Sequence, residues 1–354
     1  MIIQASLFFI ILLAGLPAQA AVVLEYHHIS DKTPKSTSIS PEKFNAQMDY
    51  LANNHFKIVS VIELAEKLRK GEALPDKTVA ISFDDSYATV YQAAFPLLKK
   101  RGWPFTFFIN TAAVSTSSLF VTWDQLREMS HNGATIANHT MYHNHVPRLK
   151  EGETRSQWRE RTKTEIEQAQ TTIEKEMGSA PKIFAYPFGE YDVEVQKLLK
   201  ELDFIAFGQQ SGPLGSQADL QSVPRFPFGG SFTELDDFIM KVNTLPMPIN
   251  RIQFFADKQH EINNLIVKQG EQPYLVLNIS NNNLLDKIHC FATGQGAINS
   301  EIIDGKLWVQ AKQPLPQGRT RYNCTAASSE KGRFYWYTQQ WLATDKTGIW
   351  NYND

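Results

Sequence analysis

Between residues 21 and 243, short apolar runs alternate with longer segments in which apolar side chains recur every three or four positions. The short runs are typical of buried strands, and the longer segments are typical of helices with one apolar face. Repeated strand–helix units of this kind indicate a parallel sheet covered by helices, either open or closed as a barrel. The pattern predicts strands at 22–26, 78–83, 105–109 and 135–137, and helices from 41, at 61–68, at 93–100 and at 154–177.

Beyond residue 250 the pattern changes to short strands separated by Gly, Asn and Pro turns, which predicts an all-β sandwich. The segment Thr244–Asn250 contains two prolines and is expected to be a linker. We therefore expect a larger α/β domain over residues 21–248 and a β-rich accessory domain over residues 249–354. The strands expected in the second part are 274–279, 287–291, 306–310, 322–325 and 334–342.

The N-terminus has the pattern of an export signal. Residues 2–16 are an apolar run, and Ala18 and Ala20 form a small-residue cleavage pattern. We expect residues 1–20 to be a signal peptide, no membrane span to remain after cleavage, and the protein to be periplasmic or extracellular. A retained anchor stays as the alternative, because no Lys or Arg precedes the run, although the run is shorter than the about 20 residues of a spanning helix.

Charge and cysteine content narrow the class of protein further. The 354 residues include 35 basic and 37 acidic side chains, a near balance that does not favour nucleic acid as a partner. The two cysteines are Cys290 and Cys324, both in the expected β-rich part. Export to an oxidising compartment predicts a disulfide between them, with two buried thiols as the alternative.

Candidate chemistry lies just after the expected strands. Asp84 and Asp85 follow one strand, and His139 and His143 follow another. A carboxylate with two imidazoles is a three-ligand set that leaves a position on zinc open for water, although cobalt, nickel or iron would also fit. We expect the two histidines to share one face of a helical turn, with His145 as an alternative to His143.

Three segments carry a resemblance to a known family. Residues 79–85, 139–143 and 184–189 resemble the three motifs of the NodB-type polysaccharide deacetylases, carbohydrate esterase family 4, and the resemblance covers about residues 22–230. It implies a distorted (β/α) barrel and a metal-dependent hydrolase. In that family pattern Asp84 would be the general base, and the metal ligands would be Asp85, His139 and His143.

The resemblance also implies roles around the third motif. The main-chain N–H near Phe188 would help to hold the oxyanion, which requires a preset donor. Pro187 and Tyr87 are expected at the same oxyanion and substrate site. The family places an arginine where this chain has Ala185, and Arg225 is expected to supply that charge to the base. The glycine that usually follows the two aspartates is Ser86 here.

The general acid departs from the usual family pattern. No histidine lies between His145 and His260, where the family draws its acid, but Leu24–His28 ends the first strand. This resembles the circularly permuted branch, which includes poly-β-1,6-N-acetylglucosamine deacetylases. His27 is therefore expected to be the acid that protonates the leaving amine, with His28 as the alternative.

The resemblance predicts an exported deacetylase acting on an N-acetylglucosamine polymer, with the β-1,6-linked polymer as first choice. A peptidoglycan or chitin-type deacetylase is the second hypothesis. A catalytically degenerate glycan-binding protein is the third, motivated by Ser86 and Ala185. The aromatics of the β-rich part would either bind glycan where they are exposed, or serve core packing or the docking of a partner protein. Its tryptophans are Trp308, Trp336, Trp341 and Trp350.

Overall fold

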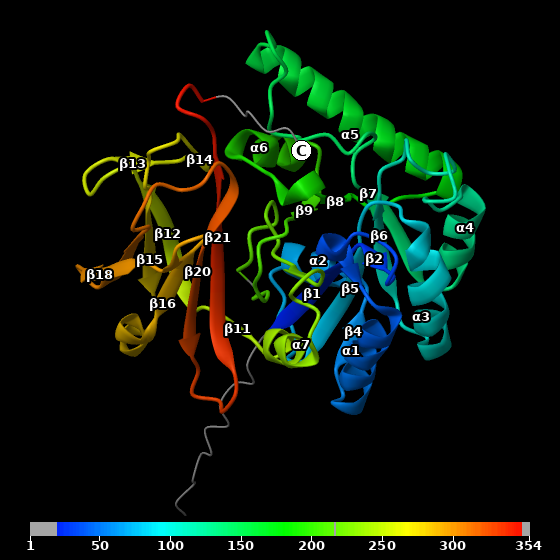
Figure 1. The fold of residues 1–354 in the computed structure, drawn as a ribbon, viewed down its shortest axis with the longest axis horizontal. Coiled ribbons are helices and arrows are strands. Elements are labelled where there is room, and N and C mark those ends of the chain that lie inside the picture. Colours follow the sequence, from blue (N-terminus) through cyan, green and yellow to red (C-terminus); the bar gives the residue numbers. More distant parts are fainter. Residues whose placement is uncertain (1–19, 216, 349–354) are drawn as a thin grey trace, which may run out of the picture.

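A computed structural model describes residues 20–215 and 217–348. A helix-covered barrel lies beside a pair of antiparallel sheets (Figure 1). The expected signal peptide, apart from Ala20, and Trp350 lie outside the described residues. Within the described ranges, no helix combines the length and the apolar character that crossing a bilayer requires.

The barrel is built on a sheet in which every paired strand is parallel. Its order is β10-β1-β5-β6-β7-β8-β9, with β4 added beside the first half of β5. Both faces are buried, as is usual for parallel sheets. The strands are β1 (Ala21–Tyr26), β4 (Lys57–Val59), β5 (Thr78–Phe83), β6 (Phe105–Ile109), β7 (Ala134–Asn138), β8 (Ile183–Ala185), β9 (Ile205–Phe207) and β10 (Phe226–Pro227).

The two ends of this sheet approach each other through the segment before β10. Val223 forms a parallel bridge with Phe207 on β9, and its N–H donates to the Ala206 carbonyl at 2.9 Å. Three residues later the chain enters β10, where Phe226 pairs with Leu24 of β1. The fold is therefore the distorted barrel that was expected, with β1 beside β5 as the permuted arrangement requires.

Helices cover the outside of the barrel (Figure 1). Residues along β1 alternate between two apolar clusters, so that Val22 and Leu24 pack with α1 residues such as Met48, whereas Val23 packs with Phe108 and Phe207. The helices are α1 (Pro41–Asn53), α2 (Val61–Arg69), α3 (Phe95–Arg101), α4 (Trp123–His131), α5 (Arg155–Met177), α6 (Val193–Glu201) and α7 (Leu235–Val242).

Helix starts follow local sequence signals. Ser40 caps α1 by accepting from the Lys43 N–H, with Pro41 at the first helical position. Thr154 begins α5 with a capping box that includes Gln157. Shorter elements fill the connections: β2 (His28–Ile29), η1 (Lys35–Thr37), β3 (Ser38–Ile39), the π-helical η2 (Val90–Ala94) and η3 (Pro187–Gly189).

The C-terminal β region consists of two antiparallel-rich sheets. The first contains β11 (Leu245–Pro246), β14 (Ile266–Val267), β16 (His289–Ala292), β17 (Gly296–Ala297), β20 (Gly318–Ala327) and β21 (Phe334–Ala343). The second contains β12 (Ile249–Phe255), β13 (Glu261–Ile262), β15 (Tyr274–Ile279), β18 (Asn299–Ile303) and β19 (Lys306–Gln310), and η4 (Asn282–Lys287) connects the sheets.

The two β sheets share one apolar core, and a disulfide joins two of its strands. Cys290 on β16 and Cys324 on β20 are directly opposite each other and are bonded, which confirms the expected pairing. Trp341 is fully buried in this core. Trp308 is half-buried against Phe255, with ring centroids 4.9 Å apart.

The prediction of a linker over Thr244–Asn250 is wrong. Leu245 and Pro246 form β11, which pairs in parallel with β21, and Ile249 begins β12. The prolines fit because β11 is the edge strand of its sheet, where a missing N–H costs little. The presence of proline therefore does not distinguish a flexible linker from a short edge strand.

Strands β20 and β21 lie on the side of the C-terminal β region that faces the barrel (Figure 1). Trp336 on β21 packs edge-on against Phe226 of β10, with ring centroids 5.4 Å apart. Arg333 donates two hydrogen bonds to the Asp76 carboxylate, at 2.7 and 3.0 Å, and one to the Asn243 carbonyl at 2.8 Å. These contacts fix how the two parts meet.

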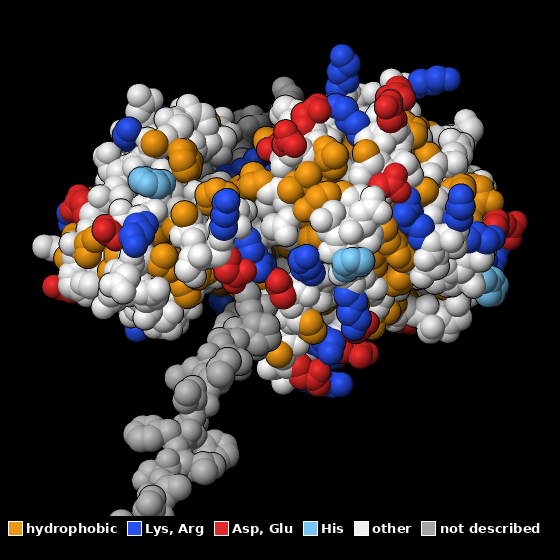
Figure 2. Space-filling view, turned by 90° about the horizontal axis from the view of Figure 1, so that it is seen from below, with side chains coloured by type: hydrophobic (Ala, Val, Ile, Leu, Met, Phe, Trp, Pro, Cys, Tyr) orange, Lys and Arg blue, Asp and Glu red, His pale blue; other side chains and the backbone are white. Residues whose placement is uncertain are grey.

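The outer surface seen from below carries mixed charges. Lys and Arg side chains are interspersed with Asp and Glu over both parts of the molecule (Figure 2). A surface of this kind agrees with the near balance of 35 basic and 37 acidic residues. This face presents no basic stripe of the type that binds nucleic acid.

Candidate active site

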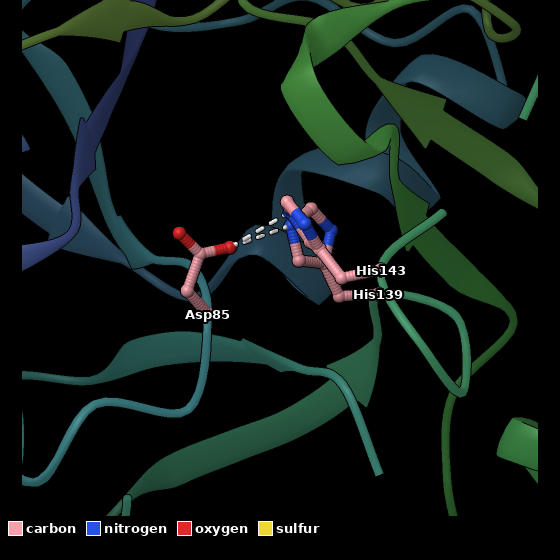
Figure 3. Close-up of side chains that lie close together, drawn as sticks. All are labelled: Asp85, His139 and His143. Carbon is pink, nitrogen blue, oxygen red and sulfur yellow. Dashed lines mark hydrogen bonds and ion pairs between the residues drawn. The ribbon is translucent and has the colours of Figure 1, made fainter. Parts of the chain in front are cut away.

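Three side chains converge at the carboxyl ends of β5 and β7. Asp85 Oδ1 lies 3.1 Å from His139 Nε2 and 3.0 Å from His143 Nε2 (Figure 3). One donor atom from each residue lies within 4.8 Å of the others. A set of one carboxylate and two imidazoles with this convergence fits a divalent metal with an open position. The structure thus brings together the three expected ligands.

The two histidines do not share a helical turn, so that local prediction is wrong. Thr140 and His143 have left-handed backbone conformations, with φ of 66° and 58°. The turn is held by side chains: the Thr140 N–H donates to Asn138 Oδ1, and the His143 N–H donates to Thr140 Oγ1, both at 2.9 Å. These bonds fold His143 back beside His139, and His145 does not join the ligand cluster.

His139 is oriented by the third motif. Its Nδ1 lies 2.8 Å from the Ala185 carbonyl, which can only accept, so the proton is assigned to Nδ1. The Nε2 lone pair then faces Asp85, as metal ligation requires. Burial alone would lower the pKa of His139, but the neighbouring Asp84 and Asp85 carboxylates outweigh burial and raise it.

Asp84 forms a buried pair with Arg225. The guanidinium donates from Nη1 to Oδ1 at 2.8 Å and from Nη2 to Oδ2 at 2.7 Å, and its Nε donates to the Gly208 carbonyl at 2.8 Å. Both side chains are fully buried. Burial raises the pKa of Asp84, but Arg225 and His139 more than offset this and hold it below its usual range. Arg225 thus lies where the missing motif arginine would act.

His27 and His28 point to different places. His27 lines the pocket, with Nε2 3.8 Å from Asp85 Oδ2 and 3.7 Å from Glu25 Oε1. His28 is buried and its ring stacks on Tyr87, with centroids 3.6 Å apart. Of the two expected candidates for the acid, only His27 lies beside the ligand cluster.

The third motif forms a tight turn next to the histidines. Phe188 has φ of 55°, and its ring centroid lies 4.5 Å from that of His143. The next two amides are already bonded within the turn, the Gly189 N–H to Tyr186 and the Glu190 N–H to Pro187. Phe188 and Tyr87 line the pocket, whereas Pro187 is buried in the turn beneath it.

Part of this set lines one cavity of about 660 Å³, namely His27, Asp85, Tyr87, His143 and Phe188. His139, Asp84 and Arg225 are fully buried and are not part of its wall. Barrel residues form most of its wall, and three residues of β20 close one side. The depth of the site therefore depends on both parts of the chain. Besides the expected residues, the wall includes Glu25, His145, Arg148, Glu190, Gln209, Phe232, Gly318, Arg319 and Arg321.

Sequence reasoning missed Glu25. It lies next to the carboxyl end of the apolar strand β1, is fully buried, and neither of its oxygens makes a hydrogen bond in the described residues. Its closest charges are Arg225 Nε at 3.6 Å and His27 Nε2 at 3.7 Å. Burial raises the pKa of this carboxyl. A lone charged residue within a buried strand was the signal that could have identified it.

A second group at the pocket wall was also missed. Glu190 accepts from Arg148 Nη2 at 2.9 Å and lies 2.9 Å from His145 Nδ1. The His145 ring stacks on Phe188, with centroids 3.8 Å apart. His145 therefore supports the turn of the third motif from a site next to the ligand cluster.

The match to a family model falls on the barrel. Residues 71–207 match the family model described as polysaccharide deacetylase. The poly-β-1,6-N-acetyl-D-glucosamine N-deacetylase of Escherichia coli (strain K12) is 23% identical over 265 residues, covering 65% of this chain and 39% of that protein. The protein of that name in Staphylococcus epidermidis is 25% identical over 230 residues, covering 58% and 78%. The chain thus spans 39% of the length of the first of these relatives.

Solved structures of deacetylases share the fold. The Streptococcus pyogenes deacetylase PplD, in complex with acetate, superposes with a TM-score of 0.57 at 21% identity, covering 64% of this chain and 99% of that one. IcaB from Ammonifex degensii gives a TM-score of 0.54 at 24% identity, with coverage of 61% and 95%. These structures show that the barrel has the fold of known deacetylases. Residues 71–207 within it match a polysaccharide deacetylase domain.

Proposed function

We propose that this protein is an exported, metal-dependent hydrolase that removes N-acetyl groups from a polysaccharide containing N-acetylglucosamine, with the β-1,6-linked polymer as the first substrate to test. One observation carries the proposal: His27 lines the same cavity as two of the three expected metal ligands, Asp85 and His143. The Asp84 carboxylate, paired with Arg225, is buried within 4.8 Å of His27. The names of the relatives support the choice of polymer.

The proposed reaction divides the work among this chain's side chains. A divalent ion held by Asp85, His139 and His143 would supply Lewis acidity toward the acetyl carbonyl and toward water. Asp84, kept ionised and oriented by Arg225, accepts the proton that water loses as its oxygen bonds to the acetyl carbon. His27 donates a proton to the sugar nitrogen as the C–N bond breaks, and acetate leaves.

The turn of the third motif would hold the developing negative charge. We assign this to the Phe188 N–H, because the amides of Gly189 and Glu190 already bond within the turn. A preset donor of this kind contributes about 3 kcal/mol to catalysis in other hydrolases. Pro187 would support the turn from below rather than contact substrate.

Two departures from the family motifs had motivated a non-catalytic, glycan-binding alternative. Arg225 reaches Asp84 from a different segment, so Ala185 does not leave the base without its guanidinium. Ser86 adopts φ of 61°, and its hydroxyl donates to Asn110 Oδ1 at 2.7 Å, which holds the turn after Asp85. Both contacts support the enzymatic proposal.

Acetate release from soluble poly-β-1,6-N-acetylglucosamine tests the proposal. We expect release that a chelator stops and added metal restores. Asp85→Asn should lose metal and reduce the rate at least about 1000-fold, whereas Asp286→Asn, an exposed carboxylate in η4, should change neither. His27→Ala should retain metal and lose activity. Full activity of metal-free Asp85→Asn would refute the assignment.

The second substrate hypothesis is tested in the same assay. Release from chitin oligomers or peptidoglycan fragments, with none from the β-1,6 polymer, would move the protein to that group of deacetylases. Metal binding without release from any acetylated glycan would favour the glycan-binding alternative.

A further inference from the structure

Strand β20 presents two arginines toward the barrel. Along this strand Thr320, Tyr322 and Cys324 are buried, and Tyr322 and Cys324 belong to the core of the C-terminal β region. Because side chains alternate along a strand, Arg319 and Arg321 point to the opposite face. That face meets the barrel, and both arginines line the cavity that contains Asp85 and His27.

Arg319 lies close to the turn of the third motif. Its Nη1 donates to Gln209 Oε1 at 2.7 Å, and a Cβ placed on Gly189 would overlap the same nitrogen. Gly189 therefore leaves room for the guanidinium to reach the site. Arg319 keeps part of its side chain exposed to solvent, whereas burial lowers the pKa of its guanidinium.

The two guanidinium groups have no carboxylate partner. Among residues 20–215 and 217–348, no ion pair within 4.0 Å involves Arg319 or Arg321. The carboxylates of the cavity have other neighbours: Asp85 the histidines, and Glu25 the Arg225 guanidinium. Glu190 pairs with Arg148. Arg319 and Arg321 therefore feel Glu25, and Arg319 also Glu190, only at longer range than an ion pair.

We propose that Arg319 and Arg321 form a subsite for an anionic group, a carboxylate or a phosphate, on the glycan chain next to the sugar that reacts. Guanidinium groups match both anions through paired N–H donors. The inference rests on the proposed function, and it changes the preferred substrate from the neutral β-1,6-linked polymer to an acetylated glycan that carries acidic groups. It also gives the C-terminal β region a direct role in binding glycan.

The test compares three acetylated amino-sugar tetramers, one neutral, one bearing a lactyl carboxylate and one bearing a phosphate. We expect kcat/KM of the wild-type protein to be about tenfold higher for an anionic tetramer than for the neutral one, equivalent to about 1.4 kcal/mol. The two anionic tetramers tell which anion the subsite prefers. Equal kcat/KM for all three would overturn the proposal.

Variants locate the preference. Arg319→Gln with Arg321→Gln should bring the ratio of anionic to neutral kcat/KM close to one. The matched control is Arg251→Gln, an exposed arginine on β12 away from the cavity, which should keep the wild-type ratio. A double variant that keeps the tenfold ratio would contradict the assignment.

A measurement on the wild-type protein avoids any folding defect of the variants. Raising NaCl from 0.05 to 0.5 M should reduce the ratio several-fold, because salt screens charge pairs in a solvated cavity. Binding of the three tetramers to the metal-depleted protein separates the two proposals. Charge-dependent binding without acetate release would leave the subsite in place and remove the deacetylase. Acetate release without a preference for anionic tetramers would support the deacetylase and overturn the anionic subsite.

Discussion

At the scale of single residues, the buried Asp84–Arg225 pair is the most consequential contact. Both side chains are inaccessible to solvent and satisfy each other through two hydrogen bonds. Arg225→Met should lower the free energy of unfolding by about 3–5 kcal/mol, because it leaves a buried carboxylate uncompensated. Urea unfolding followed by tryptophan fluorescence measures this.

The control is the double variant with Asp84→Asn added, which removes the orphaned charge. We expect it to regain part of the lost stability while remaining inactive. A double variant less stable than Arg225→Met alone would show that the loss comes from packing and not from charge.

His28 predicts a pH dependence of stability. Burial, aided by the nearby His27, lowers its pKa from 6.5 to about 4. The folded protein thus disfavours protonation of His28. Above pH 6.5 the residue is neutral in both states, and as the pH falls toward 4 the unfolded chain takes up the proton first, which lowers the free energy of unfolding. The expected loss is about 1–2 kcal/mol after allowance for solvent screening.

His28→Phe keeps an aromatic ring against Tyr87 and removes the titrating group. Its free energy of unfolding should fall less than that of the wild type between pH 7 and 4.5. Identical pH profiles for the two proteins would contradict the prediction.

The residues that sequence could locate are those next to strand ends. Asp84, Asp85 and His139 each follow a strand, and parallel strands bring their carboxyl ends to one edge. The geometry of His143 could not be predicted, because its position depends on the Thr140 hydroxyl and on a left-handed backbone rather than on helical spacing. The place of Arg319 in the cavity wall could not be predicted either, because it depends on how the C-terminal β region packs against the barrel.

At the scale of elements, the loop that carries His143 is held by α5. Trp158 is buried, and its indole N–H donates to the Val146 carbonyl at 2.9 Å. Trp158→Phe keeps most of the apolar contact but leaves that buried carbonyl unbonded, at a cost of about 1–3 kcal/mol. We expect metal affinity, measured by calorimetry, to fall about tenfold.

Trp103→Phe provides the comparison. Trp103 precedes the amino end of β6, whereas the expected metal ligands lie at the carboxyl ends of the neighbouring strands. It should leave metal affinity unchanged. Equal affinities for the two variants would mean that the Val146 bond does not hold the loop.

Element types were predicted better than connections. The strands 274–279 and 306–310 have the bounds that alternation of side chains indicates. The expected linker became β11 and the start of β12, because pairing with β21 outweighed the local preference of its prolines. Pairing with a strand so far along the chain cannot be predicted from the seven residues of Thr244–Asn250 alone.

At the scale of the whole molecule, Arg333 and Asp76 tie the barrel to the C-terminal β region. Their two hydrogen bonds join a loop before β5 to the start of β21. A double-mutant cycle with Asp76→Ala and Arg333→Ala should give a coupling energy of about 1 kcal/mol in thermal unfolding. Asp76→Ala combined with Arg251→Ala should be additive, and an additive first pair would contradict the tie.

The shared cavity has a consequence for the order of events during synthesis. Glu25 and His27 lie near the start of the chain, whereas Arg319 and Arg321 lie near its end. The barrel strands emerge first, but this wall is complete only after β20 has been made and has paired with β16 and β21. The last strands to be made therefore complete the cavity, and a chain interrupted before them would lack the wall that carries Arg319 and Arg321.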